Sequence, residues 1–464
     1  MARPALITRE NLVPFLYRRE PVSAATMAAA LGVNRSTIVR ALATLGKDLV
    51  VLGNTRNTRY ALRRPVRNLG SGWPIYQMNE SGRASLWAEL EALQDRSWRI
   101  IWAGSPPAWA HHLSDAEGLW DGFPFFLGDI RPQGFLGRAL AHKYARSLTL
   151  PENPIAWSDE DTLIFLQAAG VDLPGSLIVG DSCLAQANQQ VLFPREGRIL
   201  SRAAAASCYP ELADTATSTL AGSSAGGEQP KFLTTLLNED GTHHSVLVKF
   251  SPPPGQAAGQ RYGDLLLCEY HAHQILANNS LAQPGCRLLD AGGRRFLEVP
   301  RFDRTPRGGR RGVISLAALH GSAIGAAHHD WPTKALELGD AGLMDAAGTA
   351  TVRRLHAFGD LIGNTDMHPG NLAFWLEESI PFRPAPAYDM LPMLWAPGPQ
   401  GEIIPRVFRP SLPLPAARTA WLEAYPMALA FWQNAAADPR LSPEFLNFAG
   451  QAMDTLGRLR QHVG

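Results

Sequence analysis

The chain has 464 residues, of which 45% are hydrophobic, so it is long enough to form several domains with ordinary cores. Its four cysteines form no CxxC pair, so we expect neither a disulfide framework nor a zinc site. No apolar run reaches membrane-spanning length, and charge and proline interrupt the first apolar stretch, so we expect no membrane span and no signal peptide. We therefore expect a soluble, cytoplasmic protein. Its net charge of +1 conceals an uneven distribution of charged residues along the chain.

Basic charge is concentrated in the first part of the chain. Residues 1–67 contain twelve arginines and lysines but only three acidic residues, whereas the remaining chain has 31 basic and 39 acidic side chains. This division predicts a basic module attached to an acidic body.

The basic module has the pattern of a helix-turn-helix. Residues 23–31 and 35–45 predict two short helices joined by a glycine turn, and the second helix should direct Val39 and Leu42 inward. Two strand-like stretches, "LVVLG" and "TRYALRR", then flank a short wing. The unit resembles a winged helix-turn-helix domain, and we expect DNA contacts from the second helix and the wing: Arg35, Ser36, Thr37, Arg40, Arg56 and Arg59. The alternative is a docking module whose arginines form a solvated face.

Residues 74–220 contain no chemical motif of their own. "PIYQM" (74–78) and "WRIIWAG" (98–104) predict strands, while "SLWAELEAL" (85–93) predicts a helix. We interpret this part as a subdomain that carries a substrate-binding or lid function, with a purely structural scaffold as the alternative.

A stretch of small residues, "SSAGGEQPKF" (223–232), precedes a predicted hairpin. The strands "KFLTTLLN" and "HSVLVKF" flank a turn at Asp240-Gly241. A loop of small residues lets backbone N–H groups approach phosphate oxygens, although this signal alone is weak.

Lys249 lies near the end of the second strand of this hairpin, in "VLVKF". Its ammonium group would be buried among apolar residues unless it had an anionic partner. In enzymes of the protein-kinase type, a lysine in this place holds the nucleotide phosphates and is positioned by a helix glutamate. Glu269 is the candidate for that glutamate, and an exposed carboxylate on an amphipathic helix is the alternative.

Asp366 and Asn371 stand five residues apart in "NTDMHPGN". A kinase catalytic loop has the same interval, with the aspartate orienting the attacking hydroxyl and the asparagine holding magnesium. Asp389, in the apolar frame "PAYDMLPM", is placed to add a second metal ligand. The small-residue loop, lysine, glutamate, D-x4-N and final aspartate follow one another in kinase order.

Five motifs give the chain a family resemblance. "SSAGGEQPKF", "VLVKF", "VPRFDR", "NTDMHPGN" and "PAYDML" resemble the HipA family of bacterial serine/threonine kinase toxins, and the fused N-terminal module resembles the YjjJ branch. The resemblance covers about residues 220–450 in specific motifs. It implies an α+β, two-lobed, protein-kinase-like fold with an N-terminal winged helix-turn-helix domain, which binds ATP and Mg²⁺ and phosphorylates serine.

The resemblance also implies roles for single residues. Asp366 would be the catalytic base, Asn371 and Asp389 the magnesium ligands, and Lys249 the phosphate-holding lysine. The motif "PRFDR" would form the hinge against the adenine and ribose. The expected ATP-binding set is Ala225, Gly226, Gly227, Gln229, Lys249, Arg301, Phe302, Asp303, His368 and Tyr388. Self-phosphorylation that switches the enzyme off is expected at Ser223 or Ser224.

Three departures from the family pattern bear on turnover and target. Gly370 stands where the family loop often has a lysine, Pro300 stands where better-known members have a glutamate, and the small-residue loop is one residue longer. The first two changes remove a charge near the phosphates and a carboxylate at the hinge, and the three together bear more on turnover and target than on ATP binding.

The predicted organisation has four parts: residues 1–67 for DNA binding, 74–220 as the N-terminal subdomain, 221–305 as the ATP-binding small lobe and hinge, and 306–464 as a mostly helical catalytic lobe. The predicted function is a protein kinase whose DNA-binding domain serves autoregulation, acting on an unidentified protein, with a translation component as one candidate. A transcriptional regulator whose kinase fold only senses nucleotide is the alternative, and a small-molecule kinase is a third reading.

Overall fold

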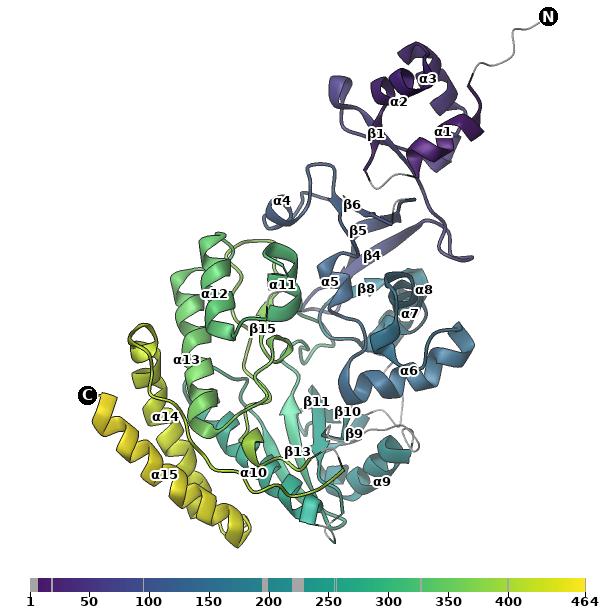
Figure 1. Ribbon diagram of the computed structural model, residues 1–464. Helices are drawn as coiled ribbons and strands as arrows, with labels where there is room; N and C mark the ends of the chain where they lie inside the picture. Colours follow the sequence, from purple (N-terminus) through teal and green to yellow (C-terminus); the bar gives the residue numbers. More distant parts are fainter. Residues whose placement is uncertain are drawn as a thin grey trace, which may run out of the picture.

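The computed structural model is elongated, with the N-terminal unit at one end and the C-terminal helices at the other (Figure 1). It describes residues 7–17, 20–94, 96–193, 199–218, 229–253, 255, 257–325, 328–398 and 400–463. Among these residues, no helix combines the length and the apolar character that crossing a membrane requires.

The N-terminal unit combines three helices with a small antiparallel sheet of order β1-β3-β2. Its elements are α1 (Arg9–Leu16), β1 (Val22–Ser23), α2 (Ala24–Leu31), α3 (Arg35–Ala43), β2 (Leu49–Leu52) and β3 (Arg59–Leu62). Gly32 ends α2 with φ +67°, a left-handed conformation that glycine adopts without strain, and this turns the chain into α3. The two predicted helices and the two predicted strands of this unit are confirmed. Of the two residues predicted to face inward from α3, Leu42 is buried but Val39 is 41% exposed. Ile38 is buried in its place.

The N-terminal unit packs directly onto the next sheet. The backbone N–H of Gln94 donates to Leu62 at 2.9 Å, and Arg63 lies 2.5 Å from the buried carboxylate of Glu91. Leu93 joins an apolar cluster with residues of β2 and β3. These contacts fix the position of the unit relative to the middle of the chain.

The middle part is built on a five-stranded antiparallel sheet of order β7-β6-β5-β4-β8. Its elements are β4 (Gly72–Met78), β5 (Ala84–Ala92), β6 (Trp98–Trp102), α4 (Ala110–Leu113), β7 (Leu119–Trp120), α5 (Phe125–Gly128), α6 (Gly134–Leu148), α7 (Asp159–Ala169), β8 (Leu177–Val179) and α8 (Asp181–Leu192). The strand predictions for β4 and β6 are confirmed, but the helix predicted at residues 85–93 is wrong, because this stretch is the central strand β5. Its pairing with both β4 and β6 outweighs the helix propensity of its Ala, Leu and Glu residues.

A second five-stranded sheet, of order β12-β13-β11-β10-β9, carries the predicted hairpin. Its elements are β9 (Ile199–Ser201), α9 (Ala205–Ser218), β10 (Lys231–Leu237), β11 (His243–Phe250), α10 (Ala257–Asn278), β12 (Arg287–Ala291) and β13 (Arg294–Pro300). Helix α9 packs on one face through Tyr209, while α10 packs on the other through Leu266 against Leu297 (Figure 1). Strand β11 pairs with both β10 and β13, so Lys249 lies in the interior of the sheet.

The remainder is mostly helical, as predicted for the C-terminal third. Its elements are β14 (Val313–Ser315), α11 (Leu316–Ala323), α12 (Trp331–Asp340), α13 (Ala346–Ile362), β15 (Ala373–Trp375), α14 (Arg418–Ala437) and α15 (Pro443–Val463). Buried aromatic residues such as Phe358, Phe431 and Trp432 join α13 to α14. Because α13 is held in this core, the loop that follows it starts from a fixed point.

Candidate active site

The buried lysine of β11 has two carboxylate partners. Its Nζ atom lies 2.5 Å from Oε1 of Glu269, which comes from α10, and it also pairs with Asp389. Lys249 and Glu269 are 4% and 3% exposed. Burial alone would lower the pKa of Lys249, but the charges of Asp389 and Glu269 outweigh it and raise this pKa above its ordinary value. The lysine is therefore held as a cation, and the lysine–glutamate pairing expected from the sequence is present.

Asp389 occupies a strained backbone position, with φ +55°. Burial would raise the pKa of its carboxyl group, but Lys249 and Lys231 outweigh that effect and lower it to about 2. Asp389 is therefore ionised at neutral pH, as a metal-binding carboxylate must be.

The loop after α13 places Asp366 beside Asp389. Gly363 ends the helix with φ +76°, and the buried side chain of Asn364 then joins two segments. Its Oδ1 accepts from the backbone N–H of Asp366 at 3.0 Å, and its Nδ2 donates to the backbone carbonyl of Asp389 at 3.3 Å. The Nδ2 atom of Asn371 closes the loop by donating to the Asp366 carbonyl at 2.9 Å. The geometry of the loop thus depends on two asparagines.

Asp366 itself is accessible to solvent. Partial burial of its carboxyl group raises its pKa, His368 opposes this shift, and Asp389 adds to it. A carboxylate with a raised pKa that can reach solvent is suited to accept a proton from a bound hydroxyl group.

Two oxygen atoms in this arrangement are available to a metal. Within the described part of the chain, neither Oδ1 of Asn371 nor Oδ2 of Asp389 accepts a hydrogen bond. Amide and carboxylate oxygens are hard ligands of the kind that Mg²⁺ prefers, and Mg²⁺ completes its coordination with water and phosphate oxygens. Among the described residues there is no group of three His, Cys, Asp or Glu side chains arranged to hold a metal. A metal held by Asn371 and Asp389 would therefore take its other ligands from water or from a bound substrate.

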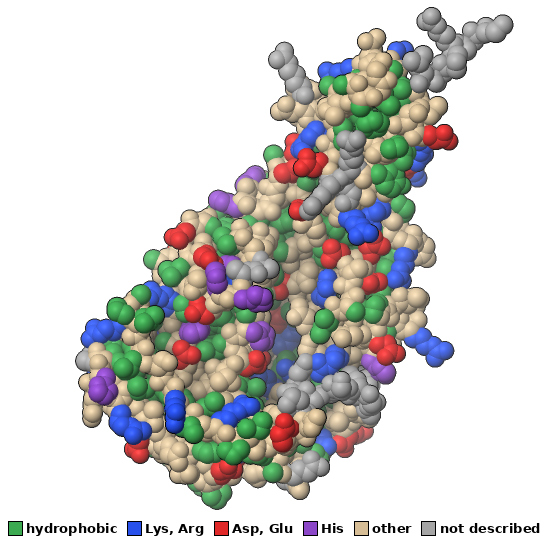
Figure 2. Space-filling model, in the orientation of Figure 1, with side chains coloured by type: hydrophobic (Ala, Val, Ile, Leu, Met, Phe, Trp, Pro, Cys, Tyr) green, Lys and Arg blue, Asp and Glu red, His purple; other side chains and the backbone are tan. Residues whose placement is uncertain are grey.

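Aromatic residues lie beside the loop. The hydroxyl of Tyr388 donates to the carbonyl of Gly370 at 2.7 Å, and the ring of Tyr388 lies 5.9 Å from that of Phe302. His368 is exposed, and its Nδ1 accepts from the N–H of Gly370 at 3.1 Å. A Cβ atom at position 370 would lie only 2.9 Å from Cε1 of His368, so glycine fits this arrangement where a lysine would force the histidine to move. Figure 2 shows histidine and acidic side chains along one side of a hollow in this face of the molecule.

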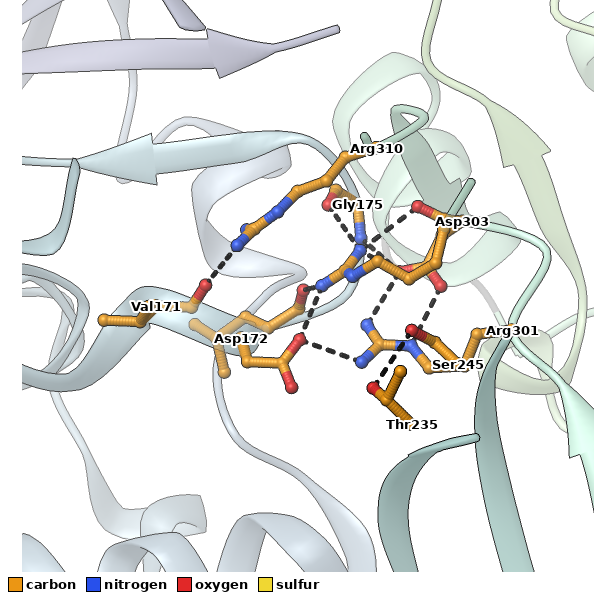
Figure 3. Close-up of polar contacts among 10 residues, drawn as sticks. Val171, Asp172, Gly175, Thr235, Ser245, Arg301, Asp303 and Arg310 are labelled. Carbon is orange, nitrogen blue, oxygen red and sulfur yellow. Dashed lines mark hydrogen bonds and ion pairs between the residues drawn. The ribbon is translucent and has the colours of Figure 1, made fainter. Parts of the chain in front are cut away.

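Arg301 and Asp303 of the predicted hinge are engaged with the middle part of the chain. Arg301 lies 2.9 Å from Asp172 and 3.0 Å from Asp303, and Asp303 also accepts from the N–H of Gly175 at 2.9 Å (Figure 3). Arg304 binds both carboxylates. These side chains therefore connect two parts of the fold, and the predicted ATP contacts of Arg301 and Asp303 would have to coexist with these ion pairs.

The remaining predicted nucleotide residues are divided between described and undescribed segments. The amide of Gln229 donates to the Phe250 carbonyl at 2.5 Å, just before β10 begins. The predictions for Ser223, Ser224, Ala225, Gly226 and Gly227 fall outside the described residues.

The predicted DNA-contacting residues are not equally available. Arg35, Ser36 and Arg40 are exposed on α3, and Thr37 is half-buried. The Arg59 guanidinium lies 2.9 Å from Glu117 and 3.5 Å from Asp115 of the middle part, so acidic side chains already occupy it. The side chain of Arg56 falls outside the described residues.

The sequence interpretation assigned no role to Asn364 or Asp172. Asn364 stands within the quoted "NTDMHPGN" motif, two residues before Asp366, so the motif contained the signal. Asp172 is separated from its partners by about 130 residues and offers no local pattern.

Two family models match the chain. A model described as the YjjJ-like toxin middle domain matches residues 69–188, and one described as the HipA-like C-terminal domain matches residues 223–449. Toxin YjjJ of Escherichia coli (strain K12) is 34% identical over 457 residues, which cover 97% of this chain and 98% of that protein.

Two solved structures give weaker matches. A chain of the toxin–antitoxin complex of HipA, HipB and operator DNA from Shewanella oneidensis MR-1 is 15% identical, with a TM-score of 0.49, covering 83% of this chain and 97% of that one. The proinflammatory kinase CtkA of Helicobacter pylori is 14% identical, with a TM-score of 0.38, covering 51% of this chain and 91% of that one. Because these scores are low, we base the family assignment on the sequence matches.

Proposed function

The chain belongs to the YjjJ branch of the HipA-like toxin family, and we propose that it is an ATP- and Mg²⁺-dependent serine/threonine protein kinase of this family. The observation that carries the proposal is the convergence of three distant segments. Lys249 pairs with Asp389, Asn364 joins Asp389 to Asp366, and the backbone of Asp366 is bound by Asn371.

Each of these residues has a role in phosphoryl transfer. ATP would supply the phosphoryl group, and Mg²⁺ would neutralise charge on it. Lys249 would bind phosphate oxygens while Glu269 keeps its ammonium group oriented, and Asn371 and Asp389 would ligate the metal through their available oxygens. Asp366 would orient the substrate hydroxyl and accept its proton, a role for which its raised pKa suits it.

The nucleotide base is the remaining part of ATP to be accommodated. We propose that Phe302 and Tyr388, whose rings lie 5.9 Å apart beside the loop, supply apolar surface for it. Gln229 and His368 stay in the proposed ATP-binding set. Self-phosphorylation at Ser223 or Ser224 also remains a prediction.

The test is incubation of the purified full chain with labelled ATP, with and without Mg²⁺, followed by mapping of phosphorylated residues. Magnesium-dependent label on serine or threonine supports the proposal. Nucleotide binding without transfer to the chain, to a model protein substrate or to a bacterial extract would favour the nucleotide-sensing regulator. Transfer to small metabolites alone would favour a small-molecule kinase.

We also propose that residues 1–67 form a winged helix-turn-helix domain that binds duplex DNA. The supporting observation is that α3, which stands in the place of a recognition helix, presents Arg35 and Ser36 to solvent at its start and Arg40 in its last turn. Because Arg59 is paired with Glu117, we assign the main contacts to α3 and give the wing a smaller part. Binding of the full chain to duplex DNA, measured at several salt concentrations, tests this second function.

A further inference from the structure

A basic groove of about 660 Å³ lies between helices α6, α8 and α9 and the strands β10 and β11. Its described lining includes six cationic side chains but only one carboxylate, that of Asp172. The six cations define what we call the arginine groove: Lys143, Lys231, Arg301, Arg304, Arg307 and Arg310. None of Lys249, Asp366, Asn371 or Asp389 lines it.

The single carboxylate is already occupied. Asp172 lies 2.9 Å from Arg301 and 2.9 Å from Arg304. Asp303 pairs with the same two arginines from outside the groove. Among the described residues that line the groove, no second carboxylate is present to balance the charges of Arg307, Arg310 and the two lysines.

Arg310 is the most informative of these residues. Its side chain lies close to the cluster of Asp172, Arg301 and Asp303, and its Nη2 atom donates to the carbonyl of Val171 at 2.6 Å (Figure 3). The residue is only 6% exposed, and its Nη1 atom has no hydrogen-bond partner among the described residues. Burial and the neighbouring Arg304 lower the pKa of this guanidinium to about 9. Asp172 and Asp303 oppose this shift, but among the described residues no hydrogen bond joins either carboxylate to Arg310. The buried Nη1 group is therefore unsatisfied, which is costly, and a bound anion would relieve that cost.

One wall of the groove, formed by α6, is mostly apolar, although it also carries Lys143. Phe135, Leu136, Leu140 and Tyr144 of α6 line it. Guanidinium groups bind phosphate oxygens in pairs, and an apolar wall with an aromatic residue suits a flat, uncharged group. Pockets of several hundred cubic ångströms accommodate molecules of nucleotide size.

We propose that the arginine groove is a second ligand site, separate from the catalytic residues, that binds a diphosphate-bearing small molecule such as a nucleotide. The phosphates contact Arg307 and Arg310, and the uncharged part lies against α6. Lys231 pairs in register with Lys249 and influences the pKa of both Asp366 and Asp389, so an anion bound here lies within electrostatic reach of the proposed active site.

Calorimetric titration of the full chain without Mg²⁺, using inorganic pyrophosphate and ADP as probes, tests the proposal. Arg307→Ser is the main variant because Arg307 is exposed, so its loss leaves the core intact, and Arg310→Met removes the buried guanidinium. Arg409→Ser, an exposed arginine outside the groove, is the control. Lys249→Met removes the lysine of the proposed ATP site.

We expect pyrophosphate to bind the wild type and to bind Arg307→Ser and Arg310→Met about tenfold more weakly, which corresponds to the removal of one charge-assisted hydrogen bond. Arg409→Ser should retain wild-type pyrophosphate affinity. Lys249→Met should lose only the pyrophosphate binding that involves the proposed ATP site and should keep the binding that Arg307→Ser and Arg310→Met weaken. In the Lys249→Met variant, tighter binding of ADP than of pyrophosphate would show that the nucleoside contacts the apolar wall. Equal binding of the two would show that the groove recognises only the diphosphate. The proposal is overturned if pyrophosphate does not bind at low ionic strength, or if Lys249→Met abolishes binding while Arg307→Ser keeps it. Because the readout is binding without transfer, failure here is distinguishable from failure of the kinase proposal.

Discussion

The ammonium nitrogen of Lys249 lies 2.5 Å from Oε1 of Glu269, and both side chains are buried between β11 and α10. The other carboxylate oxygen of Glu269 has no hydrogen-bond partner among the described residues. Among the described residues, Glu269 thus bonds through its side chain to Lys249 alone. This bond holds the lysine where it also pairs with Asp389. In the proposed function, Lys249 would bind a phosphate group while Glu269 remains its buried partner.

The first prediction concerns this pair. Glu269→Gln should weaken ATP binding about tenfold and lower the free energy of unfolding by about 1–3 kcal/mol, because Lys249 loses a charged acceptor but keeps Asp389. ATP titration and urea denaturation measure the two effects. The exposed Glu423→Gln serves as the control and should change neither. Unchanged ATP affinity in Glu269→Gln would show that the pair does not position the lysine.

Asn364 should act as a positioning residue. Asn364→Ala removes the hydrogen bonds to Asp366 and Asp389, so we expect kcat to fall by about ten- to hundredfold, as is usual for residues that orient metal ligands. The dissociation constant for ATP should change little, because Asn364 has no proposed contact with the nucleotide. Thr365→Ala, at the exposed neighbouring position, is the matched control. Equal loss of activity in both variants would attribute the effect to general disturbance of the loop.

The ion pairs around Asp303 should make stability depend on acid pH. Burial would raise the pKa of Asp303, but Arg301 and Arg304 lower it to about 2, below the value of about 3.9 for an unfolded aspartate. The stabilisation from these ion pairs is thus fully present at pH values above the pKa of the unfolded aspartate, and it is lost as the pH falls toward 2.

The Asp303→Asn variant should be less stable by about 3–5 kcal/mol at neutral pH, because Arg301 and Arg304, whose side chains are only 10% and 8% exposed, lose one of their partners. Its unfolding free energy should vary less than that of the wild type between about pH 4 and pH 2. Denaturant unfolding at several pH values measures this, with the exposed Asp454→Asn as control. A wild-type pH dependence in Asp303→Asn would assign the acid sensitivity to other carboxylates.

DNA binding should depend more on α3 than on the wing. Arg35→Ala and Arg40→Ala should each weaken binding of the full chain to duplex DNA and reduce the slope of log affinity against log salt by about 1, because each variant removes one cation that neutralises a phosphate. Arg59→Ala should have a smaller effect because Glu117 and Asp115 already pair with it. Fluorescence anisotropy with labelled duplex measures all three variants. An Arg59 effect as large as that of Arg35 would mean that DNA displaces these carboxylates.

Much of the site was predictable because its chemistry has a local signature. The interval between Asp366 and Asn371 and the lysine in an apolar strand are each visible within a few residues of sequence. Both match what the proposed phosphoryl transfer requires, so they could be interpreted without any knowledge of tertiary structure.

The contacts between distant segments could not be predicted in this way. Residues 85–93 have helix-forming composition, and only pairing with β4 and β6 makes them a strand. Arg59 was interpreted as free for DNA because Glu117 lies 58 residues away in sequence. The partners of Arg301 and Asp303 were hidden for the same reason, since they come from the middle part of the chain.

The central claim is that Asp366 acts in phosphoryl transfer, and the rate of transfer from labelled ATP by wild type and Asp366→Asn measures it most directly. Replacing the carboxylate by an amide of the same shape removes the proton acceptor, so we expect the rate to fall by about a hundredfold or more. The ATP dissociation constant and the unfolding free energy should remain those of the wild type, because Asp366 is accessible to solvent and makes its loop contacts through its backbone. Undiminished transfer by Asp366→Asn would contradict the assignment of the catalytic loop.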